Sequence, residues 1–263
     1  MVHIKSESEI EAMRKAGALA GKCLDAMLAL VQPGVTPLEI DGACRKWSES
    51  NGAIPAPLNY HGFPASLCIS VNDVVCHGIP DARPFEKGDV VNLDVTPILK
   101  GFHGDTNATV VVGAKNLDQV APKLRHLIEA TRHSMWLGIK TVKPGSTVGD
   151  IGYAIQAYIE KEGFTVVREY CGHGIGRVFH EEPEIRHYGI PGRGLKLQAG
   201  MIFTIEPMVN LGRREILLED DGWTVRTKDG SISAQFEHTI LVTKDGYEVL
   251  TLRSSEAEFK GVS

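Results

Sequence analysis

The sequence lacks the features that mark secreted, membrane-spanning and nucleic-acid-binding proteins. Its five cysteines are odd in number and form no CxxC pair, which suits reduced thiols better than a disulfide framework. The first residues, MVHIKSESEIEAMRKAG, have no apolar core like that of a signal peptide, and no run of about 18 apolar residues occurs. Lysine and arginine are scattered and the net charge is -5, which argues against nucleic-acid binding. We therefore expect a cytoplasmic protein that contacts neither a membrane nor nucleic acid.

What the chain does have is an internal repeat. VQPGVTPLEIDGACRKWSESNG (31–52) aligns without a gap with VKPGSTVGDIGYAIQAYIEKEG (142–163), and eight of 22 positions are identical. Unrelated segments would share roughly one or two. With 263 residues, of which 43% are hydrophobic, the chain is long enough for one large domain. We expect a single domain over residues 1–263, built from two related halves at about 10–115 and 120–250.

Both copies of the repeat begin with helix signals. Thr36 and Thr147 are each followed three residues later by an acid, which is the capping-box pattern of a helix N-terminus. An apolar stripe with helical spacing follows, and Gly52 and Gly163 stand where a helix C-terminus is expected. Another amphipathic stretch precedes each Pro-Gly pair. Each half is therefore predicted to open with a helix, a turn and a second helix.

The repeat continues into strands that end at acidic residues. When Gly88 is set on Gly200, KGDVVNLDV aligns with QAGMIFTIEP, and Asp94 falls on Glu206. The apolar runs before both acids carry β-branched residues and are bounded by glycine, as buried strands are. One acid at such a position would more often merely end a strand. Two acids at matching points of a repeat indicate a shared role.

Hairpin geometry predicts which acids meet in the first half. In a pair of antiparallel strands, residues whose numbers sum to a constant face each other. A turn at Leu99 and Lys100 would therefore place Asp94 near Asp105, although a bulge could shift such long strands by a residue or two.

The second half repeats this arrangement. The Asp-Gly pair at 221–222 is a strong turn signal, and a turn centred there places Glu206 near Glu237. Four carboxylates that converge near a pseudo-twofold axis repel one another by several kcal/mol unless cations neutralise them. We therefore predict a metal site made by Asp94, Asp105 and these two glutamates.

The stretch REYCGHGIGRVFHEEP (168–183) adds His173 and His180 among glycines. Glycines at 172, 174 and 176 indicate backbone held close to another group. One imidazole among four carboxylates makes an oxygen-rich site that favours divalent Mn, Fe, Co or Zn. Four such acids commonly hold two metals roughly 3.5–4 Å apart, an arrangement that activates water, so we predict hydrolysis. The glycine order has no P-loop lysine and gives little support to nucleotide binding.

Longer segments of the chain resemble those of a known family. YHGFPASLCISVNDVVCHGIP, NLDVTPILKGFHGDT, YCGHGIGRVFHEEP, FTIEPM and DGWTVRTKDGSISAQFEHT are similar to signature segments of the bacterial type I methionine aminopeptidases, in order and in spacing. The resemblance extends from about residue 3 to about residue 252. It implies an α+β pita-bread fold, in which two pseudo-symmetric halves place helices behind a curved antiparallel sheet. It also implies a dinuclear metal centre between the halves.

The resemblance assigns roles to individual residues. The implied metal ligands are Asp94, Asp105, His173, Glu206 and Glu237. His77 and His180 would contact the scissile peptide and the tetrahedral intermediate, and Glu206 would carry the proton. The implied reaction is attack of a metal-bound hydroxide on the carbonyl carbon of an N-terminal methionine. Peptides that begin with methionine, including nascent chains at the ribosome, would be the substrates, with a small second residue preferred.

The resemblance also implies a pocket for the methionine side chain and a site for a Na or K ion. The pocket walls would be Tyr60, Phe63, Cys68, His77, Phe179 and Trp223. Such soft aromatic surfaces suit a thioether. Many bacterial members have a tyrosine where this chain has Phe63, so its pocket lacks one hydroxyl. The monovalent ion would be bound by Asn72, Val74 and Ser233, and a monomer is expected.

Other proteins with this fold provide the alternatives. Proline-specific aminopeptidases and prolidases share the five ligands, but they normally carry a large extra N-terminal domain that this chain has no room for. Type II methionine aminopeptidases carry a helical insertion that the run from His180 to Glu206 is too short to hold. A non-catalytic binding module is expected to have lost one or more of the five ligands, and all five are present here.

Overall fold

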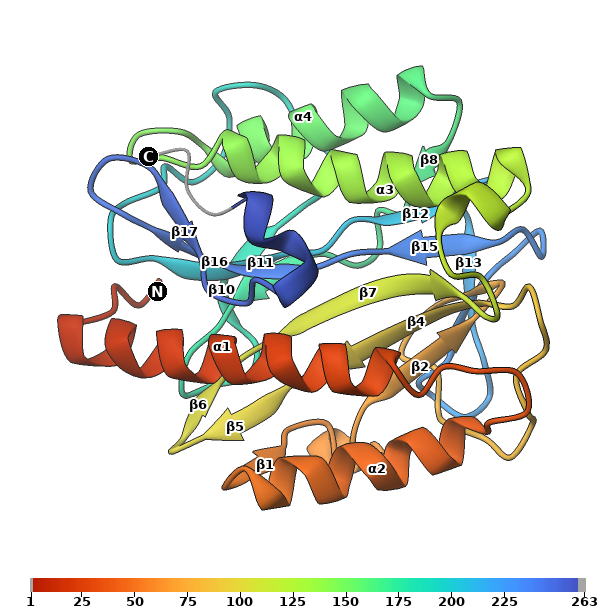
Figure 1. Ribbon diagram of the computed structural model, residues 1–263. Coiled ribbons are helices and arrows are strands. Elements are labelled where there is room, and N and C mark those ends of the chain that lie inside the picture. The colour runs from red at the N-terminus through yellow and green to blue at the C-terminus, as the bar shows by residue number, and fades with distance from the viewer. Residues whose placement is uncertain (1, 260–263) are drawn as a thin grey trace.

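Helices flank a set of antiparallel strands in the computed structural model, which describes residues 2–259 (Figure 1). The expected domain over 1–263 includes residue 1 and residues 260–263, which lie outside the described residues. The α-helices are α1 (Glu7–Leu28), α2 (Pro37–Ser50), α3 (Pro122–Lys140) and α4 (Val148–Lys161), and the 3-10 helices are η1 (Tyr60–Gly62), η2 (Leu117–Gln119) and η3 (Ser254–Phe259). In the view of Figure 1, α3 and α4 lie above the strands, α2 lies at the bottom, and β5 and β6 are seen between α1 and α2.

The strands of residues 2–259 form five small antiparallel sheets. In the first half, one sheet has the strand order β1 (Ala53–Pro55), β5 (Pro97–Leu99), β6 (Phe102–His103), and another has the order β2 (Cys68–Val71), β4 (Val90–Val95), β7 (Thr106–Val111). In the second half, a five-stranded sheet has the order β10 (Glu181–Ile185), β9 (Gly172–Gly174), β11 (Ile202–Ile205), β16 (His238–Val242), β17 (Tyr247–Val249), and a three-stranded sheet has the order β15 (Ser233–Gln235), β12 (Met208–Asn210), β8 (Thr165–Val166). The fifth sheet has the order β13 (Ile216–Leu218), β14 (Val225–Thr227), β3 (Val74–Cys76). The pairing of β14 with β3 joins the two halves of the repeat. The expected α+β architecture is confirmed.

The predicted helix, turn and helix of each half is confirmed. Thr36 caps α2 and Thr147 caps α4, each with a complete capping box closed by Glu39 or Asp150. Such a box satisfies two backbone N–H groups that the first helical turn leaves without partners. At the other end of each helix, the residue that follows the C-cap is a glycine with a left-handed φ, 69° for Gly52 and 82° for Gly163. The repeat seen in the sequence is thus a repeat of local structure.

The register predicted for the second half is confirmed along its whole length. Ile205 pairs with His238, and the same sum of residue numbers holds for β12 with β15 and for β13 with β14. The turn lies around the Asp-Gly pair at 221–222, where Gly222 has a φ of 78°. This long ribbon brings the chain segments of Glu206 and Glu237 next to each other.

The register predicted for the first half is wrong by two residues. Asp94 pairs with Asn107 instead of Asp105, because the turn falls at Lys100 and Gly101, one residue later than expected. These two residues have φ values of 51° and 81°. A two-residue turn of this kind needs positive φ at both central positions, which glycine supplies without steric cost and a bulky residue such as Leu99 does not.

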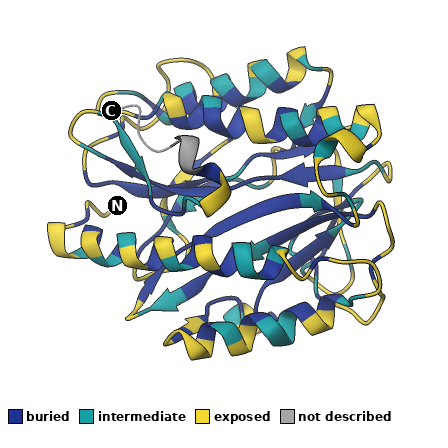
Figure 2. Cartoon of the chain, in the orientation of Figure 1, coloured by how far each residue is buried: buried dark blue, intermediate teal, exposed yellow. Residues whose placement is uncertain are grey.

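The core lies between the inner faces of the helices and the strands. It includes Leu24 of α1, Leu93 of β4, Leu127 of α3, Ile151 of α4 and Phe203 of β11, all with no exposed surface. Figure 2 shows the strands largely buried and the outer faces of the helices exposed. Close packing of this kind holds the strand ends in fixed positions. No helix of residues 2–259 is both long enough and apolar enough to cross a membrane.

Candidate metal centre

Five polar side chains converge where strands of the two halves meet. Asp94 lies on β4 and Asp105 directly precedes β7, while Glu206 directly follows β11 and Glu237 directly precedes β16. His173 lies on β9. All five line one cavity of about 630 Å³. Although the first register differs from the prediction, the structure therefore brings the predicted ligands together.

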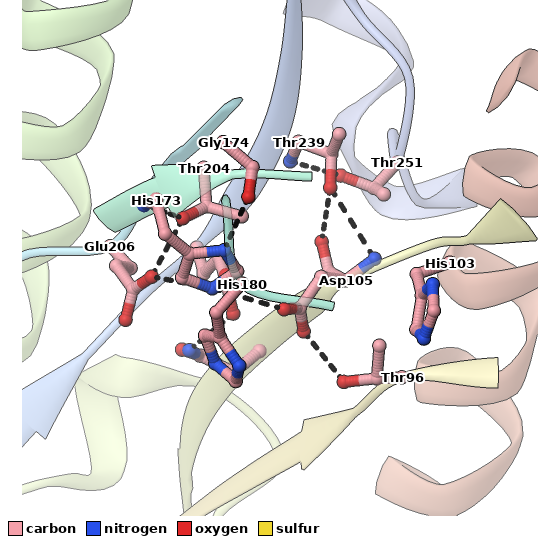
Figure 3. Close-up of polar contacts among 12 residues, drawn as sticks. Thr96, His103, Asp105, His173, Gly174, His180, Thr204, Glu206, Thr239 and Thr251 are labelled. Carbon is pink, nitrogen blue, oxygen red and sulfur yellow. Dashed lines mark hydrogen bonds and ion pairs between the residues drawn. The ribbon is translucent and has the colours of Figure 1, made fainter. Parts of the chain in front are cut away.

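His173 stands between carboxylates of the two halves (Figure 3). Its Nε2 atom lies 3.6 Å from Asp105 Oδ2 and 3.6 Å from Glu206 Oε1. Ligand atoms of Asp105, His173 and Glu237 all lie within 4.8 Å of one another. His173 Nδ1 lies 3.0 Å from the carbonyl oxygen of Gly174, which can only accept, so Nδ1 carries the proton. The lone pair of Nε2 is left to face the carboxylates.

Polar side chains that the sequence analysis missed hold the carboxylates in place. The bonds run from Thr96 Oγ1 to Asp105 Oδ1 (2.8 Å), from Asn107 Nδ2 to Glu237 Oε2 (2.8 Å), from Thr204 Oγ1 to Glu206 Oε1 (2.7 Å) and from Gln235 Nε2 to Glu206 Oε2 (3.2 Å). Each donor stands two positions from one of the four acids in the sequence. Residues two apart on a strand share a face, so this spacing is the signal that could have found them.

Burial raises the pKa of all four carboxyl groups. It raises the pKa of Asp105 to about 7 and, together with the charge of Asp105, the pKa of Glu206 to about 8. For Asp94 and Glu237, burial and repulsion by the neighbouring carboxylates raise the pKa well above its usual range. Among the described residues, no lysine or arginine forms an ion pair with the four acids. Without a cation, the cluster therefore retains protons at neutral pH.

The donor set fits divalent metal ions. Asp94 Oδ1 is buried and has no hydrogen-bond partner among the described residues. A buried carboxylate oxygen in this position is costly unless a cation compensates it. Burial lowers the pKa of His173 to about 4, so its ring is neutral at neutral pH and can donate a lone pair. Four carboxylates with one neutral imidazole are ligands of the kind that Mn, Fe, Co and Zn accept.

Two further histidines predicted from the resemblance lie at the same cavity. His77 has a left-handed φ of 55°, which is uncommon for a residue other than glycine and typical of functional sites. Burial lowers its pKa to about 4. His180 stands beside His173, with ring centroids 4.2 Å apart, and burial together with the neighbouring histidines lowers its pKa to about 3. Both rings are therefore neutral at neutral pH, and each can donate one hydrogen bond.

The six residues expected to form the methionine pocket line the same cavity. They are Tyr60, Phe63, Cys68, His77, Phe179 and Trp223. Phe63 packs edge-on against Trp223, with ring centroids 5.2 Å apart, and belongs to a small apolar cluster with Cys68. Apolar and aromatic walls with polar groups at one end are typical of sites that bind one apolar side chain.

The glycines around His173 allow backbone to approach closely, as the sequence analysis predicted. A Cβ atom on Gly172 would lie 2.3 Å from the carbonyl oxygen of Thr204, and one on Gly174 would lie 2.2 Å from that of Glu182. No side chain fits at either position. The absence of side chains thus lets β9 lie against its neighbours and present His173 to the cavity.

The proposed monovalent-ion residues lie near the seam between the halves. The backbone N–H of Ser233 donates to the carbonyl oxygen of Asn72 at 3.0 Å, and Val74 opens β3, which follows Asn72 closely. The side-chain oxygen of Asn72 accepts a hydrogen bond of 2.9 Å from the backbone N–H of Val90, which holds this segment in place. The site stays a prediction.

One buried histidine had no signal in the sequence. His187 is fully buried, and its Nε2 accepts a hydrogen bond of 3.1 Å from the backbone N–H of Glu206. A lone histidine after a strand is not distinguishable from a core or surface residue by sequence pattern. It nevertheless fixes the backbone that carries one of the four carboxylates.

Comparison with known proteins identifies the family of the chain. The model of metallopeptidase family M24 matches residues 11–244. The chain belongs to metallopeptidase family M24. Among the similar relatives, the methionine aminopeptidase A of Synechocystis sp. is 52% identical over 252 residues, which cover 95% of this chain and 98% of that protein. The methionine aminopeptidase of Escherichia coli is 50% identical over 257 residues, covering 97% of this chain and 96% of the relative.

Solved structures place this M24 protein in the same fold. A crystal structure of methionine aminopeptidase from Rickettsia prowazekii matches with a TM-score of 0.93 and 52% identity, covering 96% of this chain and 100% of that one. A prolidase from Pyrococcus furiosus matches with a TM-score of 0.75 but only 23% identity, and the match covers 66% of that chain. The second likeness supports the fold alone. The pita-bread fold expected from the sequence is confirmed.

Proposed function

We propose that this M24 protein is a metal-dependent aminopeptidase that removes the N-terminal methionine from peptides and nascent proteins. The observation that carries the proposal is the cluster of one neutral histidine and four carboxylates, of which Asp105 and Glu237 are buried and the other two half-buried. This cluster opens into a largely apolar cavity large enough for a methionine side chain. High identity to methionine aminopeptidases over nearly the whole chain supports it. No comparable identity supports proline-specific activity.

The proposed ligands of two divalent ions, drawn from Co, Mn, Fe and Zn, are Asp94, Asp105, His173, Glu206 and Glu237. When bound, such ions polarise the scissile carbonyl and make a water molecule nucleophilic at neutral pH. The free amine of the peptide fits beside the same carboxylates, because it is positively charged or able to coordinate. An enzyme built in this way acts only at a chain end.

The chain's own groups complete the proposed chemistry. Glu206 accepts the proton of the attacking water on a carboxylate oxygen and delivers it to the leaving amine. Its hydrogen bonds from Thr204 and Gln235 hold the carboxylate that takes up and returns the proton. His77 and His180 are neutral and donate hydrogen bonds to the scissile peptide and to the oxyanion that develops from its carbonyl oxygen. The aromatic pocket excludes water and positions the methionine side chain.

The decisive experiment is hydrolysis of defined peptides. Purified protein supplied with Mn or Co should release methionine from Met-Ala and Met-Gly peptides. It should release little alanine from an Ala-Pro peptide, which would be the substrate of a proline-specific relative. Absence of turnover with each of Mn, Co, Fe and Zn would overturn the proposal and favour a binding module.

Several finer features belong to the same proposal. By its likeness to methionine aminopeptidases, the protein is proposed to prefer small second residues, to act as a monomer and to work on nascent chains in the cytoplasm. The monovalent ion at Asn72, Val74 and Ser233 is proposed to be structural, because these residues lie outside the cavity. Metal analysis of protein purified without added metal would identify the divalent ion.

A further inference from the structure

Tyr60 and His180 form a direct hydrogen bond across the cavity, between residues 120 positions apart. The phenolic oxygen of Tyr60 lies 2.8 Å from His180 Nδ1, and the two ring centroids are 5.2 Å apart. Tyr60 comes from the first half of the repeat and His180 from the second. The bond therefore links the aromatic pocket to a ring that faces the proposed reaction centre. It gives Tyr60 a contact that lining the methionine pocket does not require.

The direction of this bond and the tautomer of His180 go together. In a neutral imidazole one nitrogen donates and the other accepts. When the Tyr60 hydroxyl donates to Nδ1, the proton of the ring must be on Nε2. Among the described residues, no hydrogen bond to Nε2 competes for that proton. The ring then offers an N–H donor to whatever occupies the cavity.

The loop that presents Tyr60 has an unusual backbone. Asn59 and His61, on either side of Tyr60, have left-handed φ values of 65° and 46°. The loop is tied by a bond from the backbone N–H of Tyr60 to the carbonyl oxygen of Pro57 and by one from Phe63 to the carbonyl oxygen of Tyr60, both 2.9 Å. Non-glycine residues in this conformation persist where the surrounding structure enforces them, and they cluster at functional sites.

The orientation of Tyr60 is further limited by packing. Its ring lies 4.9 Å from that of Phe179 and 4.4 Å from that of His61, measured between centroids. Phe179 in turn stacks on His103, with ring centroids 5.3 Å apart and planes 18° apart. These contacts hold the half-buried ring with its hydroxyl towards His180, whereas a residue needed only as an apolar wall would have no use for that hydroxyl.

We propose that Tyr60 is a positioning residue, whose hydroxyl holds His180 in the tautomer that donates from Nε2 to the oxyanion. The proposal rests on the proposed function, because it gives His180 a donor role in that reaction. It assigns the hydroxyl of Tyr60 to the reaction and leaves the ring to the methionine pocket. Phe63, its neighbour in the pocket, has no hydroxyl and serves only as a wall.

A double-mutant cycle separates positioning from packing. Tyr60→Phe keeps the ring and removes the hydroxyl, and it should lower kcat on a Met-Ala peptide roughly fivefold to tenfold with little change in KM. In a His180→Ala background the same change should alter kcat by less than about twofold, because the group that it acts through is gone. Equal losses in both backgrounds, or a loss confined to KM, would overturn the proposal. Tyr153→Phe, on the exposed face of α4, is the matched control and should leave kcat unchanged.

A second measurement does not depend on activity. In metal-free protein labelled with 15N-histidine, the ring nitrogens of His180 should report the Nε2–H tautomer, and Tyr60→Phe should shift them towards a mixture of tautomers. A predominant Nδ1–H tautomer in the unaltered protein would overturn the proposal. If the protein failed to hydrolyse any Met peptide but kept this tautomer and its dependence on Tyr60, the proposed function would fall while the positioning contact would stand.

Discussion

Asp105 and Thr239, which lie 134 positions apart and in different halves, are joined by two hydrogen bonds. The hydroxyl of Thr239 donates to the carbonyl oxygen of Asp105 at 2.8 Å and accepts from its backbone N–H at 3.3 Å (Figure 3). A single side chain thus satisfies both backbone groups of a proposed metal ligand. The two halves of the repeat are fastened together at the point where their carboxylates meet.

Replacing this hydroxyl should loosen the centre. Thr239→Val keeps the shape of the side chain but leaves a buried N–H and a buried carbonyl oxygen without partners, so we expect a loss of about 2 kcal/mol in the free energy of unfolding. Urea unfolding of metal-free protein measures this loss. Thr239→Ser keeps the hydroxyl and should lose less. If the valine and serine variants were equally stable, the two bonds would not be what fastens the halves.

Removing the proposed proton carrier should separate catalysis from metal binding. Glu206→Gln keeps one oxygen, which can serve a metal or accept from Gln235, but its amide group cannot take up a proton. We expect kcat on a Met-Ala peptide to fall by at least about a hundredfold, with only a modest loss of bound metal. Rates and metal content are measured on the same samples. Glu160→Gln, on the exposed surface of α4, is the control, and near-normal turnover by Glu206→Gln would exclude the assigned role.

Much of the fold and of the candidate centre could be predicted because the repeat gives the helix-cap and strand signals twice. The capping threonines Thr36 and Thr147 and the register around Asp221 were all predicted correctly, since each rests on local turn and cap chemistry that tertiary contacts do not override. The register of the first hairpin was not, because no Asp-Gly or Asn-Gly pair marks its turn. Lys100, which precedes Gly101 in the turn, has a positive φ, and a lysine in the sequence does not indicate that conformation.

The polar residues around the metal centre were not predicted for a different reason. Thr204 and Gln235 stand two positions from Glu206 and Glu237, and that spacing places them on the face of the acids without showing which carboxylate each one bonds. Their partners are known only once the strands of both halves are brought together. His187 illustrates the limit: it bonds the backbone of Glu206, 19 positions away, and backbone partners leave no trace in the sequence.

Metal removal should make stability depend on pH in a defined window. The pKa values of Asp105 and Glu206 are raised by burial to about 7 and about 8, so both groups bind protons more tightly in the folded protein than in the unfolded chain. Stability of metal-free protein should therefore fall as pH rises from the ordinary carboxyl range up to these values, and the contribution of each group levels off above its folded pKa. The slope approaches 1.4 kcal/mol per pH unit for each group that ionises, as an order-of-magnitude figure.

The pH range of this experiment has to lie above the range in which the histidines titrate, because they change the stability of the folded protein in the opposite direction. Burial lowers the pKa values of His77, His173, His180 and His187 to about 3 or 4, so these groups raise stability as pH rises towards the ordinary histidine value. Between roughly pH 7 and pH 8.5 that contribution is complete and the carboxylates dominate. Urea unfolding in EDTA should show the fall, and Mn-loaded protein should show much less of it. A flat profile in EDTA would mean that the carboxylates are not buried as described.

The N-terminal segment should matter to the cavity through one buried ion pair. The side chain of Lys5 is 2% exposed and its Nζ atom pairs with Glu181, which follows His180 and lines the cavity. Lys5→Met should cost about 2 kcal/mol of unfolding free energy, because it leaves Glu181 largely buried without its partner. Adding Glu181→Gln should restore part of the loss, since the uncompensated charge is then gone. Urea unfolding of the two single variants and the double variant measures the coupling. Losses that simply add would show that Lys5 contributes by packing its aliphatic stem, and that its charge is immaterial to the loop that carries His180.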